Sequence, residues 1–165
     1  MNSFPVARGF LLGAAGAILA RAGLRRAMLV KLRRDLAALN AGNYQPLLAS
    51  FADDAVLVFT GGTHRWAGQH DGRASIEAFL HDFVAAGLQG DFRDLLIGGP
   101  PWKMRAAIRF DDHAKDPSGT RVYDNRTVLY VTFRWGKVVR QEDFFADTSR
   151  IEAFEHHLNR AEGHG

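Results

Sequence analysis

The chain has 165 residues, of which 47% are hydrophobic and 24% are charged, and this composition is typical of one globular domain with a core. It contains no cysteine, which excludes disulfides, thiolate metal sites and cysteine nucleophiles. The net charge of +3 is unevenly distributed, because residues 1–40 carry +6 and the remaining residues carry −3. Since the body of the chain has no basic patch interleaved with aromatic residues, no nucleic-acid partner is expected.

Residues 1–25 form a basic, partly apolar segment, and residues 26–165 are expected to form the domain. The uncharged residues 9–20 lie between Arg8 and Arg21. As a helix they rise about 18 Å, which is too short for a bilayer core of about 30 Å. The segment is a packed helix, a membrane-interface helix with its arginines on lipid head groups, or a signal-peptide core, although Arg21 argues against cleavage. A cytoplasmic protein is expected, with peripheral membrane contact through residues 1–25 as one alternative.

The predicted elements then follow in chain order. Apolar residues at helical spacing predict a first domain helix from about Arg26 to Leu39, which ends at Ala41-Gly42-Asn43. Further helices are predicted at residues 44–51, 76–83 (closing near Gly87) and 149–158. Strands are predicted at residues 55–60, 64–70, 92–97, 104–110, 121–134 and 137–145, with a polar loop at 111–119 and a tight turn at 135–136. This order predicts an α+β fold, in which a curved, mostly antiparallel sheet carries helices on its concave side and encloses an apolar pocket.

The last predicted hairpin brings together side chains that could carry chemistry. If residues 135–136 form a two-residue turn, Arg134 pairs with Lys137, and the same register pairs Tyr130 with Gln141. Alternation then places a set of residues on one face of the sheet: Arg126, Val128, Tyr130, Gln141 and Asp143. An acid beside a cation and a phenol can act as a general acid or base, or it can orient water. The alternative is an ion pair between Asp143 and Arg126 that only joins the two strands.

Several short motifs carry a family resemblance. They are Leu39-Asn40-Ala41-Gly42-Asn43-Tyr44, Phe51-Ala52-Asp53-Asp54-Ala55-Val56, Trp66-Ala67-Gly68, Asp71-Gly72-Arg73, Gly136-Lys137-Val138-Val139 and Asp143-Phe144-Phe145. Their order and spacing resemble the SnoaL-like branch of the nuclear transport factor 2-like superfamily, over roughly residues 26 to 160. The resemblance implies a cone-shaped α+β barrel, usually dimeric, with a deep apolar pocket. It does not fix one function, because the superfamily contains isomerases, cyclases, dehydratases, epoxide hydrolases and non-catalytic binders.

The resemblance also assigns roles to individual positions. Asp143 matches the final-strand aspartate that SnoaL-like cyclases are understood to use as their acid or base. Arg126 and Asp143 match two positions of limonene-type epoxide hydrolases, but Val128 replaces the acid between them, so epoxide opening is not favoured. Phe59 stands where ketosteroid isomerases carry their base, which argues against an isomerase of that type.

Two further residues lie where family members line the mouth of the pocket. His64 is a candidate general base of the dehydratase kind, or alternatively an exposed loop histidine. Trp66 is a packing residue or a surface for ligand stacking. No cofactor is expected, and the spacing of the histidines predicts no metal site. The residues expected to line the pocket are Phe59, Trp66, Val128 and Gln141.

The sequence thus predicts a small-molecule enzyme that acts by acid–base chemistry on an apolar, oxygenated substrate of polyketide or terpenoid type. Asp143 is the expected acid or base, Arg126 is expected to keep it charged and oriented, and Tyr130 is expected to donate a hydrogen bond to a substrate oxygen. His64 is a second candidate. The alternative is a non-catalytic ligand-binding or accessory module of the same fold. The expected partners are a small apolar molecule and a second copy of the chain in a homodimer.

Overall fold

A computed structural model describes residues 6–100 and 102–163, with side chains from residue 22 onward. The chain divides into two compact units between Arg34 and Asp35, and a single helix, α1 (Val6–Asn40), crosses this division. The prediction that this helix begins near Arg26 is therefore wrong. Residues 6–25 continue the same helix because they are rich in alanine and leucine and contain no proline. Among the described residues, no helix has the length and apolar character needed to cross a membrane.

The end of α1 is fixed to the sheet of the second unit. Gly42 adopts a positive φ of 86°, and Asn43 N donates to the carbonyl of Ala38 at 2.8 Å, which confirms the predicted glycine stop. The amide of Asn40 donates to Gly90 O at 2.9 Å and accepts from Gly90 N at 3.1 Å. This pair of hydrogen bonds fixes the last turn of α1 against the first residues of the third strand.

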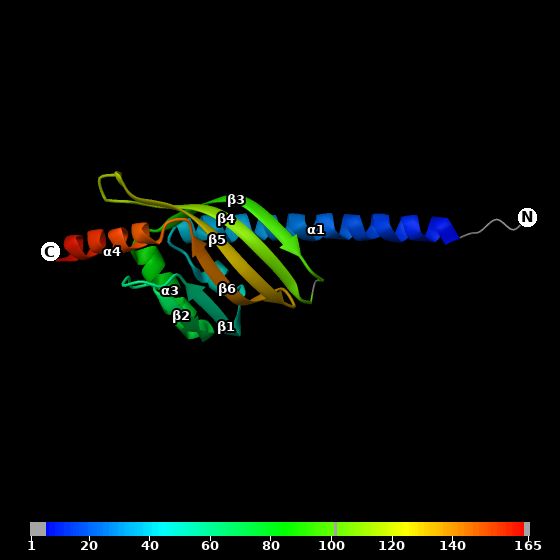
Figure 1. The fold of residues 1–165 in the computed structure, drawn as a ribbon, viewed down its shortest axis with the longest axis horizontal. Helices are drawn as coiled ribbons and strands as arrows, with labels where there is room; N and C mark the ends of the chain where they lie inside the picture. Colours follow the sequence, from blue (N-terminus) through cyan, green and yellow to red (C-terminus); the bar gives the residue numbers. More distant parts are fainter. Residues whose placement is uncertain (1–5, 101, 164–165) are drawn as a thin grey trace, which may run out of the picture. The chain divides into compact units, whose positions relative to one another are not determined.

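The second unit is an α+β structure around one six-stranded sheet (Figure 1). The strand order is β2-β1-β6-β5-β4-β3, and each neighbouring pair is antiparallel except β1 and β6. This confirms the predicted curved, mostly antiparallel sheet. The elements after α1 are α2 (Gln45–Leu48), β1 (Phe51–Phe59), β2 (Gly68–Asp71), α3 (Gly72–Ala85), β3 (Gln89–Gly98), β4 (Met104–Lys115), β5 (Arg121–Arg134), β6 (Lys137–Phe145) and α4 (Thr148–Glu162).

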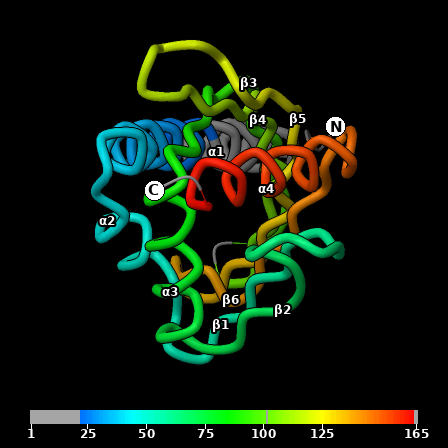
Figure 2. The backbone as a smooth tube through the Cα atoms, turned by 90° about the vertical axis from the view of Figure 1, so that its left-hand side faces the viewer, coloured from blue at the N-terminus to red at the C-terminus, as the bar shows by residue number. Residues whose placement is uncertain are grey.

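Two helices pack against the sheet of this unit. α3 lies beside β1 and β2, and α4 lies beside β5 (Figure 2). Their contacts are made by buried apolar side chains at helical spacing, Ile76, Phe79 and Leu80 in α3 and Ile151 and Phe154 in α4. The core of the unit therefore lies between the inner face of the sheet and these two helices.

The strand β4 is longer than predicted, and the difference matters for the site. It continues to Lys115, so the predicted loop at 111–119 is wrong in its first half. The turn is confined to residues 116–120, where Asp116 Oδ1 accepts from the backbone N of Ser118 and of Thr120, both at 2.9 Å. The polar residues that suggest a loop therefore belong to a strand that pairs with both β3 and β5.

The hairpin between β5 and β6 has the predicted turn but a different register. Trp135 and Gly136 both have positive φ, as a two-residue hairpin turn requires, and Arg134 pairs with Lys137 as predicted. A β-bulge follows, because Phe133 pairs with Val138 whereas Thr132 pairs with Arg140. The extra residue, Val139, shifts every later pair by one position. The predicted pairing of Tyr130 with Gln141 is therefore wrong.

Candidate functional site

The bulge places Asp143 and Arg126 on opposite faces of the sheet. Asp143 lies opposite Leu129, so it shares the inner face with Thr127 and Leu129. Val128 and Tyr130 face outward and are 39% and 40% exposed, whereas Thr127 is 2% exposed. The prediction that Arg126, Val128 and Tyr130 share a face with Asp143 is wrong for this reason. Gln141, two residues from Asp143 on the same strand, is the member of the predicted set that does face inward with it.

The surroundings of Asp143 favour its protonated form. Burial raises the pKa of this carboxyl group to about 8, the hydrogen bond from Gln141 lowers it, and the negative charge of Asp112 raises it further. The hydrogen bond joins Gln141 Nε2 to Asp143 Oδ1 at 2.9 Å. Among the described residues no cation pairs with Asp143, so Arg126 does not hold it in the charged form. At neutral pH this group is a proton donor rather than a fixed charge.

Asp112 is a second inward carboxyl group, and the sequence prediction missed it. It lies in β4, where the buried positions are Met104, Ala106, Ile108, Phe110 and Ala114. The hydroxyl of Thr127 donates to Asp112 Oδ2. Burial raises the pKa of Asp112 to about 6, the Thr127 hydrogen bond lowers it and the charge of Asp111 raises it. The signal that could have found Asp112 is this alternation, because every second residue from 104 to 114 faces the core.

An aromatic cluster occupies the interior beside these acids. Phe59 is buried, and its ring centroid lies 4.8 Å from that of Phe145 and 5.3 Å from that of Phe79. His64 is 4% exposed and meets Phe59 edge-on at 5.6 Å, so the interpretation of His64 as an exposed loop residue is wrong. Trp66 is fully buried beside it.

His64 is buried beside aromatic rings and near the carboxylates of Glu152 and Glu155. Both of its ring nitrogens are buried and unpartnered within the part of the chain that the structure describes. Burial lowers its pKa, although the carboxylates of Glu152 and Glu155 act in the opposite direction. His64 is therefore neutral at physiological pH, with one nitrogen able to donate a hydrogen bond and one able to accept.

The loop that carries His64 is anchored to α4. Arg65 Nε lies 2.9 Å from Glu155 Oε2, and Arg65 Nη1 lies 3.0 Å from Glu162 Oε1. The ring of Trp66 stacks on that of Phe154 with centroids 6.0 Å apart and an interplanar angle of 7°. These contacts fix the position of the loop, so His64 is presented by a rigid support.

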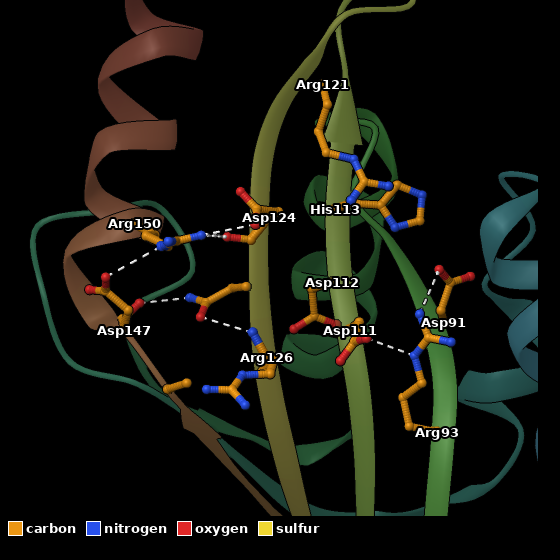
Figure 3. A pocket seen from close by; sticks show the side chains of 12 residues that line it. Asp91, Arg93, Asp111, Asp112, His113, Arg121, Asp124, Arg126, Asp147 and Arg150 are labelled. Carbon is orange, nitrogen blue, oxygen red and sulfur yellow. Dashed lines mark hydrogen bonds and ion pairs between the residues drawn. The ribbon is translucent and has the colours of Figure 1, made fainter.

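A polar cavity of about 500 Å³ lies at one end of strands β3, β4 and β5 (Figure 3). Arg93 pairs with Asp111 at 2.7 Å, and Arg150 pairs with Asp124 at 2.9 Å. The cavity is thus lined by charges of both signs, and Asp112 is among its lining residues. In the described chain no group of three or more histidines and carboxylates is arranged to hold a metal ion. The lining residues are Asp91, Arg93, Asp111, Asp112, His113, Arg121, Asp124, Asn125, Arg126, Ala146, Asp147 and Arg150.

The second unit is thus an α+β structure in which a mostly antiparallel sheet carries two inward acids beside a cluster of aromatic side chains. The family model described as SnoaL-like domain matches residues 32–141. The chain therefore belongs to the SnoaL-like family.

Individual proteins are similar to this chain in sequence or in fold. An uncharacterized protein of Mycobacterium tuberculosis is 29% identical over 125 residues, which cover 74% of this chain and 92% of the relative. An NTF2-like protein of unknown function from Burkholderia pseudomallei has a TM-score of 0.64 at 18% identity, over 77% of this chain and 95% of its own. TerC, crystallised with polyporic acid, has a TM-score of 0.63 at 21% identity, over 77% of this chain and 97% of its own. The two structures are similar to this chain in fold.

Proposed function

We propose that this protein is an acid–base enzyme for an apolar, oxygenated small molecule, with Asp143 as its proton donor. The observation that carries the proposal is the raised pKa of Asp143, about 8, on the inner face of the sheet with no cation beside it among the described residues. A carboxyl group that only joined two strands would be expected to face a basic partner, which lowers its pKa. A carboxyl group kept protonated near neutral pH is instead suited to general acid catalysis.

The exposure of the inner face supports a binding space beside Asp143. Most inward residues of β4 and β5 are buried, but Leu129 of β5 keeps partial exposure. On β6 the inward residues Gln141, Asp143 and Phe145 are also partly exposed. Burial nevertheless dominates the pKa of Asp143, so protein surrounds it. Side chains that are surrounded by protein and still accessible are expected to line an internal space. With the rings of Phe59 and Phe145 on its wall, such a space favours an apolar ligand.

In this proposal each polar group has a distinct role. Asp143 donates its proton to a carbonyl or hydroxyl oxygen of the ligand, on which negative charge develops during bond rearrangement. The neutral ring of His64, whose nitrogens are buried, supports the aromatic wall by its edge-on contact with Phe59. TerC, which shares the fold, was crystallised with polyporic acid, and this accords with an apolar ligand that carries oxygen atoms.

The test is solvent-deuterium exchange, which reports proton transfer without knowledge of the natural substrate. 2-Tetralone serves as the probe because it is an apolar fused-ring ketone with exchangeable protons beside its carbonyl. The full-length protein should accelerate deuterium incorporation from D₂O, measured by proton NMR. Asp143→Asn should reduce the catalysed rate by about 100-fold or more, since it removes the donated proton.

The matched control is Glu142→Gln, which removes the charge of the adjacent residue on the outward side of the same strand. It should retain the wild-type exchange rate. Equal rates for wild type and Asp143→Asn would contradict the enzyme proposal. Binding of the ketone with no acceleration by the wild-type protein would instead favour the non-catalytic ligand-binding module.

A further inference from the structure

Two carboxyl groups lie on the inner face of the sheet, on either side of Thr127. β4, β5 and β6 are adjacent strands, and Asp112 lies opposite Asn125 whereas Asp143 lies opposite Leu129. Thr127 is two residues from each of these partner positions. It is therefore the diagonal neighbour of both acids, and diagonal neighbours are about 7–8 Å apart. The three side chains form a row across three strands, which is called the acid row below.

Contacts within the acid row differ from one end to the other. Asp112 accepts a hydrogen bond from the Thr127 hydroxyl and is one of the residues that line the polar cavity, whose arginines Arg93 and Arg150 pair with other carboxylates (Figure 3). Asp143 accepts a hydrogen bond from the Gln141 amide and lies opposite the apolar Leu129. The end of the row at Asp112 is thus the more polar end, where a negative charge is better tolerated.

We infer that Asp112 is a second catalytic residue, the proton acceptor that works opposite the proton donor Asp143. The inference rests on the proposed function. Asp112 takes a proton from a carbon or hydroxyl of the ligand, while Asp143 gives a proton to the ligand oxygen. One proton leaves the ligand and one arrives, so the ligand carries no net charge afterwards. Asp112 is then protonated and Asp143 ionised, and the reverse transfers, or exchange of each proton with solvent water, return both acids to their starting forms.

The order of the two pKa values agrees with these roles. Asp112, with a pKa of about 6, is mostly ionised at pH 7, whereas Asp143, with a pKa of about 8, is mostly protonated. Paired acids whose surroundings separate their pKa values in this way divide the acid and base roles between them. Around Asp112 the other titratable groups are Asp111, Tyr123 and the charged residues of the polar cavity. Around Asp143 the nearest titratable group is Asp112, and His64 lies further away, on the other side of Phe59.

The inference also narrows the class of ligand. Because the acids lie on either side of Thr127, they act on two different atoms of one molecule. The ligand needs an oxygen at the Asp143 end and an acidic proton near Asp112. An apolar ketone or hydroxyketone that enolises meets both requirements.

A ligand-free experiment tests the coupling of the acid row. Carbon-13 NMR of the aspartate carboxyl groups in the full-length protein should show Asp112 titrating below Asp143. Asp112→Asn should lower the midpoint of Asp143, because a neighbouring negative charge is lost. Asp111→Asn, which changes the adjacent outward residue, should leave the midpoint of Asp143 unchanged. An unchanged Asp143 midpoint in Asp112→Asn, or an Asp112 that titrates above Asp143 in the wild type, overturns the inference.

Exchange into 2-tetralone then separates the two proposals. The wild-type rate should form a bell in pH with limbs near 6 and 8. Asp112→Asn should lower the rate by about 100-fold and remove the lower limb, whereas Asp112→Glu should retain part of the rate. Exchange that requires Asp143 but is unchanged in Asp112→Asn overturns the inference alone. No exchange in the wild type overturns the proposed function and the acceptor role of Asp112 together.

Discussion

A carboxyl group donates a proton at neutral pH only where its charged form is penalised, and Asp143 meets this condition through its position on the inner face. Burial is the largest cause of its raised pKa, and the single amide hydrogen bond from Gln141 does not compensate for it. The carboxylate of Asp112 adds repulsion from the same side of the sheet. In the unfolded chain all of these influences are absent, so folding itself changes the affinity of Asp143 for a proton.

This change predicts how stability depends on pH. The pKa of Asp143 is about 8 in the folded state and about 3.9 in an unfolded chain. Between these values the folded state holds a proton that the unfolded state lacks, so stability falls as the pH rises, by up to about 1.4 kcal/mol per pH unit. Asp143→Asn lacks this dependence. Urea denaturation from pH 5 to pH 8 should show the wild type losing stability relative to the variant.

Glu142→Gln is again the matched control and should follow the wild-type curve, because it removes an outward carboxylate. Stability curves of the wild type and Asp143→Asn that stay parallel over this range would show that the carboxyl group is already ionised in the folded protein. That result would also remove the main support for Asp143 as a donor.

Of the two inward acids, Asp143 is predicted from the sequence and Asp112 is missed, and the reason is local. Asp143 stands in a strand with a strong β pattern and at a position that the family resemblance marks. Asp112 stands in a polar run that ends in Pro117-Ser118-Gly119, and this composition predicts a loop. Pairing with β5 keeps residues 111–115 extended, and β3 pairs with residues 111–113 from the other side. Strand pairing therefore decides that Asp112 faces the core, and the local composition, which predicts a loop, does not indicate this.

At the scale of elements, one bulge decides which side chains meet. The turn at Trp135-Gly136 and both hairpin strands follow from residue types, and the structure confirms them. The extra residue at Val139 has no such signal, because valine occurs equally well at a regular strand position. A shift of one residue exchanges the two faces of a strand. The predicted cluster of Asp143, Arg126 and Tyr130 fails for this single reason, although the fold around it is predicted well.

The outer face of the sheet carries apolar side chains that remain exposed. Leu96, Tyr130 and Phe144 are 66%, 40% and 56% exposed. The register places Phe144 opposite Val128 on the adjacent strand, and it places Ala107 of β4 between Tyr130 and Leu96. A contiguous apolar surface on a sheet is expected to be covered by a partner. A second copy of the chain, which the family resemblance implies, is the occupant that we propose.

A substitution on this outer face tests the homodimer. Phe144→Lys places a charge on the apolar surface and should convert a dimer to a monomer at micromolar concentration, because burying the ammonium group is costly. Trp135→Lys is the control, since Trp135 is 77% exposed in the hairpin turn. Light scattering coupled to size exclusion measures both masses. A wild-type protein that elutes as a monomer, or a Phe144→Lys protein that stays dimeric, would exclude this face as the interface.

At the scale of the whole molecule, the chain divides into two parts both in its charge and in its compact units. Residues 1–40 carry a net charge of +6 and the rest carries −3. The division between compact units falls between Arg34 and Asp35, and the family match begins at residue 32. The basic segment, residues 1–25, therefore lies wholly outside the family match. Its charge is not explained by the proposed chemistry, so it is expected to have a separate role.

Attraction of this segment to anionic lipid is the role that its composition predicts. Each lysine or arginine near an anionic membrane contributes about 1 kcal/mol at low ionic strength, and an apolar helical stretch adds contact with the interface. The full-length protein should sediment with vesicles containing phosphatidylserine and not with phosphatidylcholine alone, and added salt should weaken the binding. A variant lacking residues 1–25 should lose this binding and keep its melting temperature, because residues 35–165 form a compact unit of their own. If the full-length protein ignores anionic vesicles, or the shortened variant still binds them, the segment is not a membrane anchor.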